Sequence, residues 1–176
     1  MQRWRGADGG VETCWLAPFA HRLAGMAAWP EGPGLRAAGY EVATDTAWRT
    51  LGATVLSDGL HLEIRRRPDG WLLNGAPAPG LEGAVDLDLG FSPSTNTLPI
   101  RRLGLMVGQS ADLTAAWLDP DDWRLKPLAQ RYTRLAVDRW HYLSRDGGFE
   151  AEITVTPEGL VRDYGHLWKE DRSHAA

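Results

Sequence analysis

The sequence predicts an all-β protein with little helix. Short segments in which apolar and polar residues alternate recur along the chain, separated by turn residues at spacings of roughly 8 to 12 residues. Nowhere does an apolar stripe at helical spacing last for three turns. Many short strands of this kind form a barrel, a roll or a sandwich, because curling or closing a sheet removes its exposed edges.

Alternation predicts six strands in the first half of the chain, at residues 12–19, 23–29, 35–43, 48–56, 60–66 and 71–74. The tripeptide SDG at 57–59 has the composition of a short hairpin loop, with a glycine available for positive φ. The tripeptide PDG at 68–70 provides a second turn, so residues 48–74 are expected to form a three-stranded meander. Residues 75–83 are rich in glycine and proline and predict a loop.

The second half begins with a strand at 85–89, on which Asp86 and Asp88 share one face because strand side chains alternate. A turn-rich run at 92–96 then leads into an expected extended segment at 100–107, which contains Arg101 and Arg102. Further extended segments are predicted at 113–118, 130–143, 149–155 and 160–161. The one helical signal is a short turn at 121–125.

A chain of 176 residues suits one domain with a sizeable core. We expect this domain to span 1–176, with a polar and frayed tail at 169–176. Nine tryptophans are spread along the chain, which indicates one shared interior, since each large ring needs burial and a partner for its N–H.

Charge and composition exclude several classes of protein. The net charge is −4 and the basic residues are interleaved with acids, so no stripe is available to follow nucleic-acid phosphates. The single cysteine, Cys14, excludes an internal disulfide and is expected to be a small packed side chain. The N-terminus has no apolar signal region and no segment is apolar enough to span a membrane, so we expect a cytoplasmic protein.

Motifs for catalysis and cofactors are weak. Residues 32–37 resemble a dinucleotide fingerprint only superficially, because they contain a proline and lack a following helix. Ser92 and Ser110 lack the second glycine of a nucleophile elbow. The five histidines show no metal-ligand spacing. We therefore expect no metal, no cofactor and no catalytic residue of these types.

One charged set remains as a candidate site. It consists of the acids at 86 and 88 and the arginines at 101 and 102. On a strand the two arginines point to opposite faces, so at least one is expected to be buried and to need an acid as its partner. The favoured interpretation is an ion-pair network that sets the strand register. The functional alternatives are a polar patch inside a largely apolar pocket, or a catalytic pair of carboxylates.

The same stretch resembles the signature of the bacterial Putative glycolipid-binding family. The similarity rests on the run Asp86-x-Asp88-Leu89 and on residues 92–103, SPSTNTLPIRRL. It extends over most of the chain, through residues 4–5, 12, 40–45, 48–50, 70–71, 130–132, 142–144, 149 and 159–164. The chain departs from the family pattern at Ala84, where a cysteine is expected, and at Gly165, where a proline is usual.

The resemblance implies a spiral β-roll, a highly curved antiparallel sheet whose concave side holds a cavity. Such a roll is similar to periplasmic carriers of lipoproteins and to mycobacterial lipid-binding lipoproteins. Glycolipid binding is inferred for the family from that shape.

Three hypotheses about function follow. In the first, the protein is a non-enzymatic module that binds a lipid or glycolipid in the cavity. Its ligand-binding residues would then be Asp86, Asp88, Arg101, Arg102, Tyr132, Tyr142 and Trp48. In the second, it is an enzyme acting on a small hydrophobic or glycosylated substrate, with one acid as general base and an arginine stabilising developing negative charge. In the third, the charged network only supports packing and there is no ligand.

Overall fold

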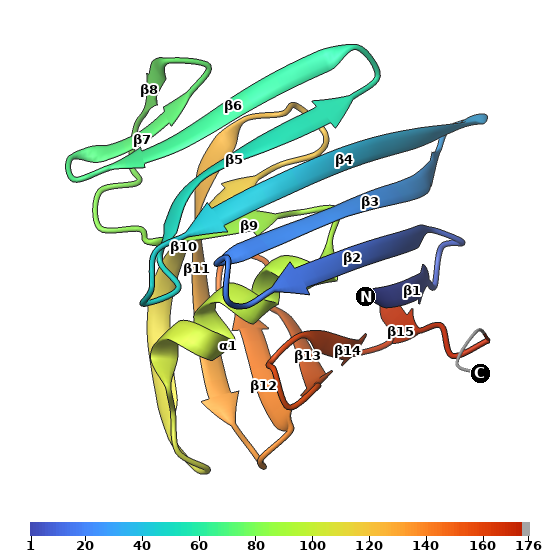
Figure 1. The fold of residues 1–176 in the computed structure, drawn as a ribbon, viewed down its shortest axis with the longest axis vertical. Coiled ribbons are helices and arrows are strands. Elements are labelled where there is room, and N and C mark those ends of the chain that lie inside the picture. The colour runs from blue at the N-terminus through green and yellow to red at the C-terminus, as the bar shows by residue number, and fades with distance from the viewer. Residues whose placement is uncertain (174–176) are drawn as a thin grey trace.

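The computed structural model describes residues 1–173 and has a single large sheet of 15 strands in that range (Figure 1). The strands of its first half are β1 (Gln2–Gly6), β2 (Val11–Ala17), β3 (Arg22–Glu31), β4 (Gly34–Thr44), β5 (Thr50–Ser57), β6 (Leu60–Arg67), β7 (Gly70–Leu73) and β8 (Ala76–Ala78). Each of these strands pairs antiparallel with the next, so the half is one continuous meander.

The second half contains the strands β9 (Asp86–Leu89), β10 (Ser110–Leu118), β11 (Leu125–Arg134), β12 (Arg139–Ser144), β13 (Phe149–Val155), β14 (Val161–Tyr164) and β15 (Trp168–Glu170). A 3-10 helix, η1 (Pro93–Asn96), and an α-helix, α1 (Thr97–Leu103), stand between β9 and β10. The strands β10 to β15 form a second antiparallel meander. Strand β9 runs parallel to β10.

The two meanders join at the chain ends. Strand β1 pairs antiparallel with β15, with Trp4 opposite Glu170, so the first and last strands lie in the middle of the sheet. The two edges are β8 and β9, and the sheet is strongly curved without closing. In Figure 1, β3–β6 cross the upper part of the molecule, β12 and β13 the lower part, and α1 lies between them. The predicted all-β, highly curved roll with little helix is confirmed.

Local turn chemistry explains the hairpins. Between β5 and β6, Asp58 and Gly59 have φ values of 45° and 83°, the pair of positive angles that a two-residue hairpin turn requires. The hairpin predicted at 57–59 is therefore confirmed, as is the strand at 149–155. The adjacent strands predicted in the first half also appear, with ends that shift by a few residues.

The extended segment predicted at 100–107 is wrong, because residues 93–103 are helical. Ser92 caps η1 by accepting a hydrogen bond from the Ser94 N–H, and Pro93 occupies the first turn, where a missing N–H costs nothing. Gly104 ends α1 in the left-handed region at φ 58°. Arginines 101 and 102 consequently lie on a helix rather than on opposite faces of a strand.

Smaller predictions also need correction. Lys169 and Glu170 form part of β15 instead of a frayed tail, because β1 offers them a pairing partner far away in sequence; residues 174–176 of that tail lie outside the described range. The loop predicted at 75–83 contains β8, and the segment 130–143 divides into β11 and β12. Of the helical turn predicted at 121–125, residues 121 and 122 form a turn, 123 and 124 are irregular, and Leu125 begins β11. Strand β1 was not predicted, since five residues show too little alternation.

The core fills the concave side of the sheet. All residues from Ser92 to Ile100 are buried there, so the helical segment is part of the interior. Cys14 is fully buried, which confirms its predicted packing role. Four tryptophans are buried in the same core, at positions 4, 48, 71 and 140, whereas Trp15 is half exposed on the outer face. No helix within residues 1–173 has the length and hydropathy needed to cross a bilayer.

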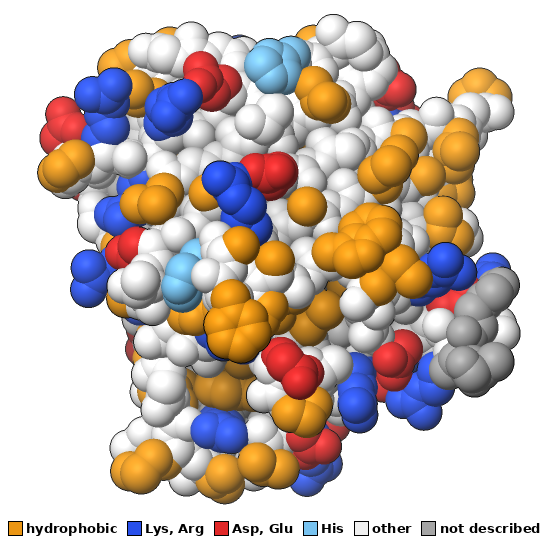
Figure 2. Space-filling view, in the orientation of Figure 1, with side chains coloured by type: hydrophobic (Ala, Val, Ile, Leu, Met, Phe, Trp, Pro, Cys, Tyr) orange, Lys and Arg blue, Asp and Glu red, His pale blue; other side chains and the backbone are white. Residues whose placement is uncertain are grey.

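Charges on the outer surface are mixed. On the face shown in Figure 2, Lys and Arg side chains alternate with Asp and Glu side chains and do not gather into one stripe. Several of them form exposed ion pairs along the strands, such as Arg22 with Glu41. Such exposed pairs are worth about 0–1 kcal/mol each, so the stability of the fold depends on its interior.

Gly25 on β3 is expected to tolerate no side chain. A Cβ there would lie 2.5 Å from the Tyr40 hydroxyl and 2.7 Å from the Thr13 carbonyl oxygen. Gly25→Ala should therefore lower the free energy of unfolding by about 2 kcal/mol or more, measured by urea denaturation. Gly39→Ala on β4 is the matched control, since a Cβ there would meet only Met26 Cγ at 4.0 Å. Equal stabilities of the two variants would contradict this account of the packing.

Candidate functional site

An aromatic pocket of about 440 Å³ opens on the concave side of the roll. Its lining comes from β9, the helical segment and the strands β10 to β15. The aromatic residues that line it are Trp117, Tyr142, Phe149, Tyr164 and Trp168, and the polar ones are Asp88, Ser92, Asn96, Ser144 and Asp146. We refer to this set as the aromatic pocket.

Three adjacent strands supply the central rings of the aromatic pocket. Tyr142 on β12, Phe149 on β13 and Tyr164 on β14 lie with their ring centres 5.7 to 6.2 Å apart, in tilted or edge-to-face geometry. Alternation on each strand turns these rings to the concave side. The result is a wall of aromatic surface along the pocket, in which Phe149 and Tyr164 are partly exposed and Tyr142 is buried.

Asp88 provides a carboxylate at the pocket wall. Its Oδ2 accepts a hydrogen bond of 2.6 Å from Gln130 Nε2, and its Oδ1 lies 3.5 Å from the Thr95 hydroxyl. Burial raises the pKa of Asp88 to about 6, because these neutral donors only partly offset the loss of water. Asp88 therefore changes its charge close to neutral pH.

Behind the pocket lies a second buried carboxyl group, Glu12 on β2. It is 2% exposed and accepts hydrogen bonds from the Tyr40 hydroxyl and, at 2.7 Å, from the Ser92 hydroxyl. Ser94 Oγ lies 2.6 Å from Ser92 Oγ and 2.7 Å from the Tyr40 hydroxyl, which completes the cluster. Burial raises the pKa of Glu12 to about 7. Ser92 thus connects this carboxyl group to the pocket.

In the sequence alone, Glu12 has no indicated role beyond its place in the family resemblance. The one sequence feature that could have pointed to Glu12 is its position on the same strand face as Cys14, which is the buried face of β2. An acid on a buried face needs hydrogen-bond donors. Here those donors come from β4 and from the helical segment, so no local sequence pattern indicates them.

Asp86 and Arg102 form a buried ion pair outside the pocket. Arg102 donates from Nε to both Asp86 oxygens at 2.9 and 3.1 Å, and from Nη2 to Oδ2 at 2.6 Å. Asp86 is 1% exposed, and burial raises its pKa despite the arginine. The predicted meeting of acid and arginine is confirmed for this pair, which ties α1 to β9.

The structure distributes the predicted ligand-binding residues over three places. Asp88 and Tyr142 line the aromatic pocket, and Tyr132 lies behind it, where its hydroxyl donates to Asn96 Oδ1 at 2.7 Å and its ring packs against Tyr142. Asp86 and Arg102 pair with each other. Arg101 stacks on the Trp48 ring at 4.0 Å, away from this pocket. Among residues 1–173, no three His, Cys, Asp or Glu side chains gather in a way that could hold a metal ion.

Comparisons with known proteins agree with this architecture. A family model described as Putative glycolipid-binding matches residues 1–170. The crystal structure of a DUF1089 family protein from Pseudomonas aeruginosa is similar, with 29% sequence identity, a TM-score of 0.82 and coverage of 94% of each chain. A search of the curated proteins gave no match.

Removing Arg102 should be costly, because Asp86 would keep a buried charge without its partner. Arg102→Met is expected to lower the free energy of unfolding at pH 7 by about 3–5 kcal/mol, and adding Asp86→Asn should recover part of that loss. Arg131→Met, which breaks an exposed pair with Asp112, should cost at most about 1 kcal/mol. Urea denaturation of the four proteins tests this, and an Arg102→Met variant as stable as Arg131→Met would refute it.

Glu12 should make stability depend on pH. Because its pKa rises from 4.5 to about 7 on folding, the folded state holds the proton more tightly, and the stability from this group is lost as pH rises from about 4.5 to about 7. The difference in unfolding free energy between the wild type and Glu12→Gln should therefore shrink by about 3 kcal/mol between pH 4.5 and pH 8. The control Phe19→Leu, at a fully exposed position and without any titratable group, should show a constant difference over this range. A constant difference for Glu12→Gln as well would contradict the shift.

Proposed function

The chain belongs to the Putative glycolipid-binding family, and we propose that it binds an amphiphile whose sugar-like head group enters the aromatic pocket. The observation that carries this proposal is the composition of the pocket: open aromatic rings and hydrogen-bonding side chains line one and the same cavity. Binding sites for small molecules have this combination of apolar surface and a few polar groups that fix orientation.

The chemistry of a sugar fits both parts of the lining. The C–H faces of a sugar ring are apolar enough to pack on the rings of Tyr142, Phe149 and Trp168, while its hydroxyl groups donate to carboxylates and accept from amides and hydroxyls. Asp88 offers acceptor oxygens, and Asn96 and Ser144 offer groups that donate or accept.

The size and the apolar lining of the aromatic pocket support the binding of an amphiphile. A volume of about 440 Å³ lies within the range of roughly 300–1,000 Å³ that is usual for small-molecule pockets. Leu89, Leu128 and Leu167 also line the pocket and offer contact to the first carbons of an acyl chain.

A second candidate function is hydrolysis of a glycosylated substrate, favoured by the raised pKa of Asp88. A carboxyl group with a pKa of about 6 can act as a general acid or base near neutral pH, and Asp146 lines the same pocket. The pair of Asp86 with Arg102 is not part of this cavity, so the enzyme would use Asp88 and Asp146. Release of nitrophenol from a nitrophenyl glycoside by the wild type, and its loss in Asp88→Asn, would establish this function.

The binding proposal can be tested with two detergents that share a chain length. Octyl β-glucoside has a sugar head, and octyl tetraoxyethylene has an uncharged head without a ring. Isothermal titration below the critical micelle concentrations should show octyl glucoside binding at least about tenfold more tightly. Asp88→Asn and Phe149→Leu should each weaken octyl glucoside binding about fivefold or more, because they remove a hydrogen-bond acceptor and a ring.

Matched controls outside the pocket are Asp112→Asn and Phe19→Leu, an exposed acid and a fully exposed ring. Both should bind octyl glucoside like the wild type. Equal affinity for the two detergents, or equal losses in pocket and control variants, would show that the pocket does not recognise a sugar.

A further inference from the structure

A second cavity, of about 560 Å³, lies at the other end of the helical segment. Its lining combines Ile100 and Arg101 of α1 with residues from the turn after β11, from β12, from the turn after β13 and from β14. Three arginines line it, at positions 101, 134 and 162. We call this cavity the arginine pocket.

The three arginines are half-buried, and none of them pairs with a carboxylate. Arg134 donates to the backbone carbonyls of Leu105, Ala136 and Val137 at 2.8 to 3.2 Å. Arg101 donates to the carbonyl of Glu158. Within the described part of the chain, the Arg162 side chain makes no hydrogen bond, and no carboxylate oxygen lies within 4.0 Å of a guanidinium nitrogen of the three arginines.

Buried N–H groups in this pocket lack acceptors. The Nε atoms of Arg101 and Arg162 are buried without a hydrogen-bond partner, and so is Nε1 of Trp140, which also lines the cavity. A buried donor without an acceptor is energetically unfavourable, and more so when it is charged. Three such donors around one cavity indicate that an acceptor belongs there.

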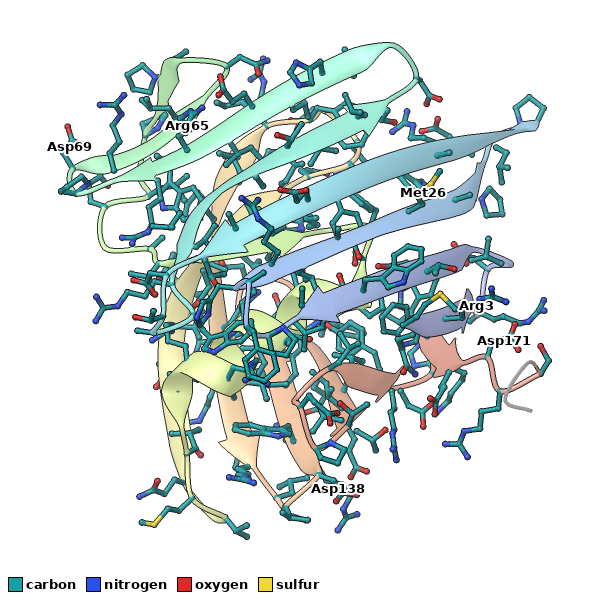
Figure 3. All side chains as sticks on the ribbon, viewed as in Figure 1. Arg3, Met26, Arg65, Asp69, Asp138 and Asp171 are labelled. Carbon is teal, nitrogen blue, oxygen red and sulfur yellow. The ribbon has the colours of Figure 1, made fainter. Side chains whose placement is uncertain are left out.

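Acids reach the pocket only at its rim. Asp138 and Glu158 are both exposed, whereas the arginines are half-buried. Figure 3 places Asp138 at the lower end of the molecule, beside the turn that joins β11 and β12. The acids of this lining are therefore more exposed to solvent than the arginines, although Glu158 is close enough to Arg101 and Arg162 to interact with both electrostatically.

Two of the arginines are held in place before any ligand arrives. The guanidinium of Arg134 lies 5.5 Å from the ring centre of Trp140, and that of Arg101 lies 4.0 Å from the ring centre of Trp48. Together with their carbonyl partners, these cation–π contacts restrain the positions of both groups. A pre-oriented guanidinium loses little entropy when it binds an oxyanion.

Four apolar side chains also line the cavity. Ile100, Val137, Val155 and Pro157 provide surface beside the charged groups. We propose that the arginine pocket binds an oxyanion, a carboxylate or a phosphate monoester, carried by a molecule with an apolar portion. This site is separate from the aromatic pocket and does not depend on it.

Octyl phosphate is a suitable probe, and the arginine Nε–H signals in nitrogen-15 NMR report on it directly. Titration should shift the signals of Arg101 and Arg162, which gain an acceptor. Arg162→Gln should weaken binding at least about tenfold, the usual value of one charged hydrogen bond. This variant should fold normally, because the Arg162 side chain makes no hydrogen bond within the described chain.

The matched control is Arg3→Gln on β1, since Arg3 is also half-buried with an unpartnered Nε but lines a different part of the molecule (Figure 3). It should bind octyl phosphate like the wild type. Glu158→Gln should tighten binding, because it removes a negative charge from the rim. Unshifted arginine signals, or equal affinities of Arg162→Gln and Arg3→Gln, would overturn the proposal.

Further titrations identify the source of the anion. If inorganic phosphate shifts the same signals with similar affinity, the oxyanion alone is the ligand; if octyl phosphate binds much more tightly, the apolar portion contributes as proposed. Asp88→Asn should leave octyl phosphate binding unchanged, which separates this site from the sugar site. Failure of octyl glucoside binding would then count against the aromatic pocket alone.

Discussion

The helical segment from Ser92 to Leu103 is the feature on which the interior of this roll depends. A curved sheet with one concave side needs something to fill it, and here the chain fills it with its own buried helix. Polar contacts hold the segment from several directions: Ser92 to Glu12 on β2, Asn96 to Tyr132 on β11, and Arg102 to Asp86 on β9. Because these contacts reach strands from both halves of the sheet, the segment links the two meanders in addition to the pairing of β1 with β15.

Placing a helix there also creates two cavities of different character. Ser92 and Asn96, around η1, face the aromatic pocket, whereas Ile100 and Arg101 of α1 face the arginine pocket. The first has rings and neutral hydrogen-bonding groups beside two carboxyl groups, and the second has three guanidinium groups beside apolar side chains and two exposed acids. A ligand that fits one is therefore chemically unlike a ligand that fits the other, although the same short segment forms a wall of both.

The buried carboxyls show two ways of keeping an acid inside a protein. Asp86 receives an arginine, which keeps a charged pair in the core at the cost of desolvating both groups. Glu12 and Asp88 receive only neutral donors, so burial raises their pKa values to about 7 and about 6. Both of these groups lie at or just behind the aromatic pocket, where a carboxyl that titrates near neutral pH is useful for binding or for proton transfer.

Local sequence patterns were sufficient to predict most strands of this protein. They predicted little about which residues meet in its two pockets. Alternation and turn residues predicted the hairpin at 57–59 and the strand at 149–155, since hairpin turns and half-buried strands record their structure in neighbouring residues. The pattern at 92–103 predicts a turn and a strand although the segment is helical, because a buried helix of seven residues is too short to show a periodic stripe. The tertiary structure alone decided that Asp88, Tyr142 and Tyr164 meet in one pocket while Arg101 faces another, because these neighbours come from strands and helices that only the curvature of the whole sheet brings together.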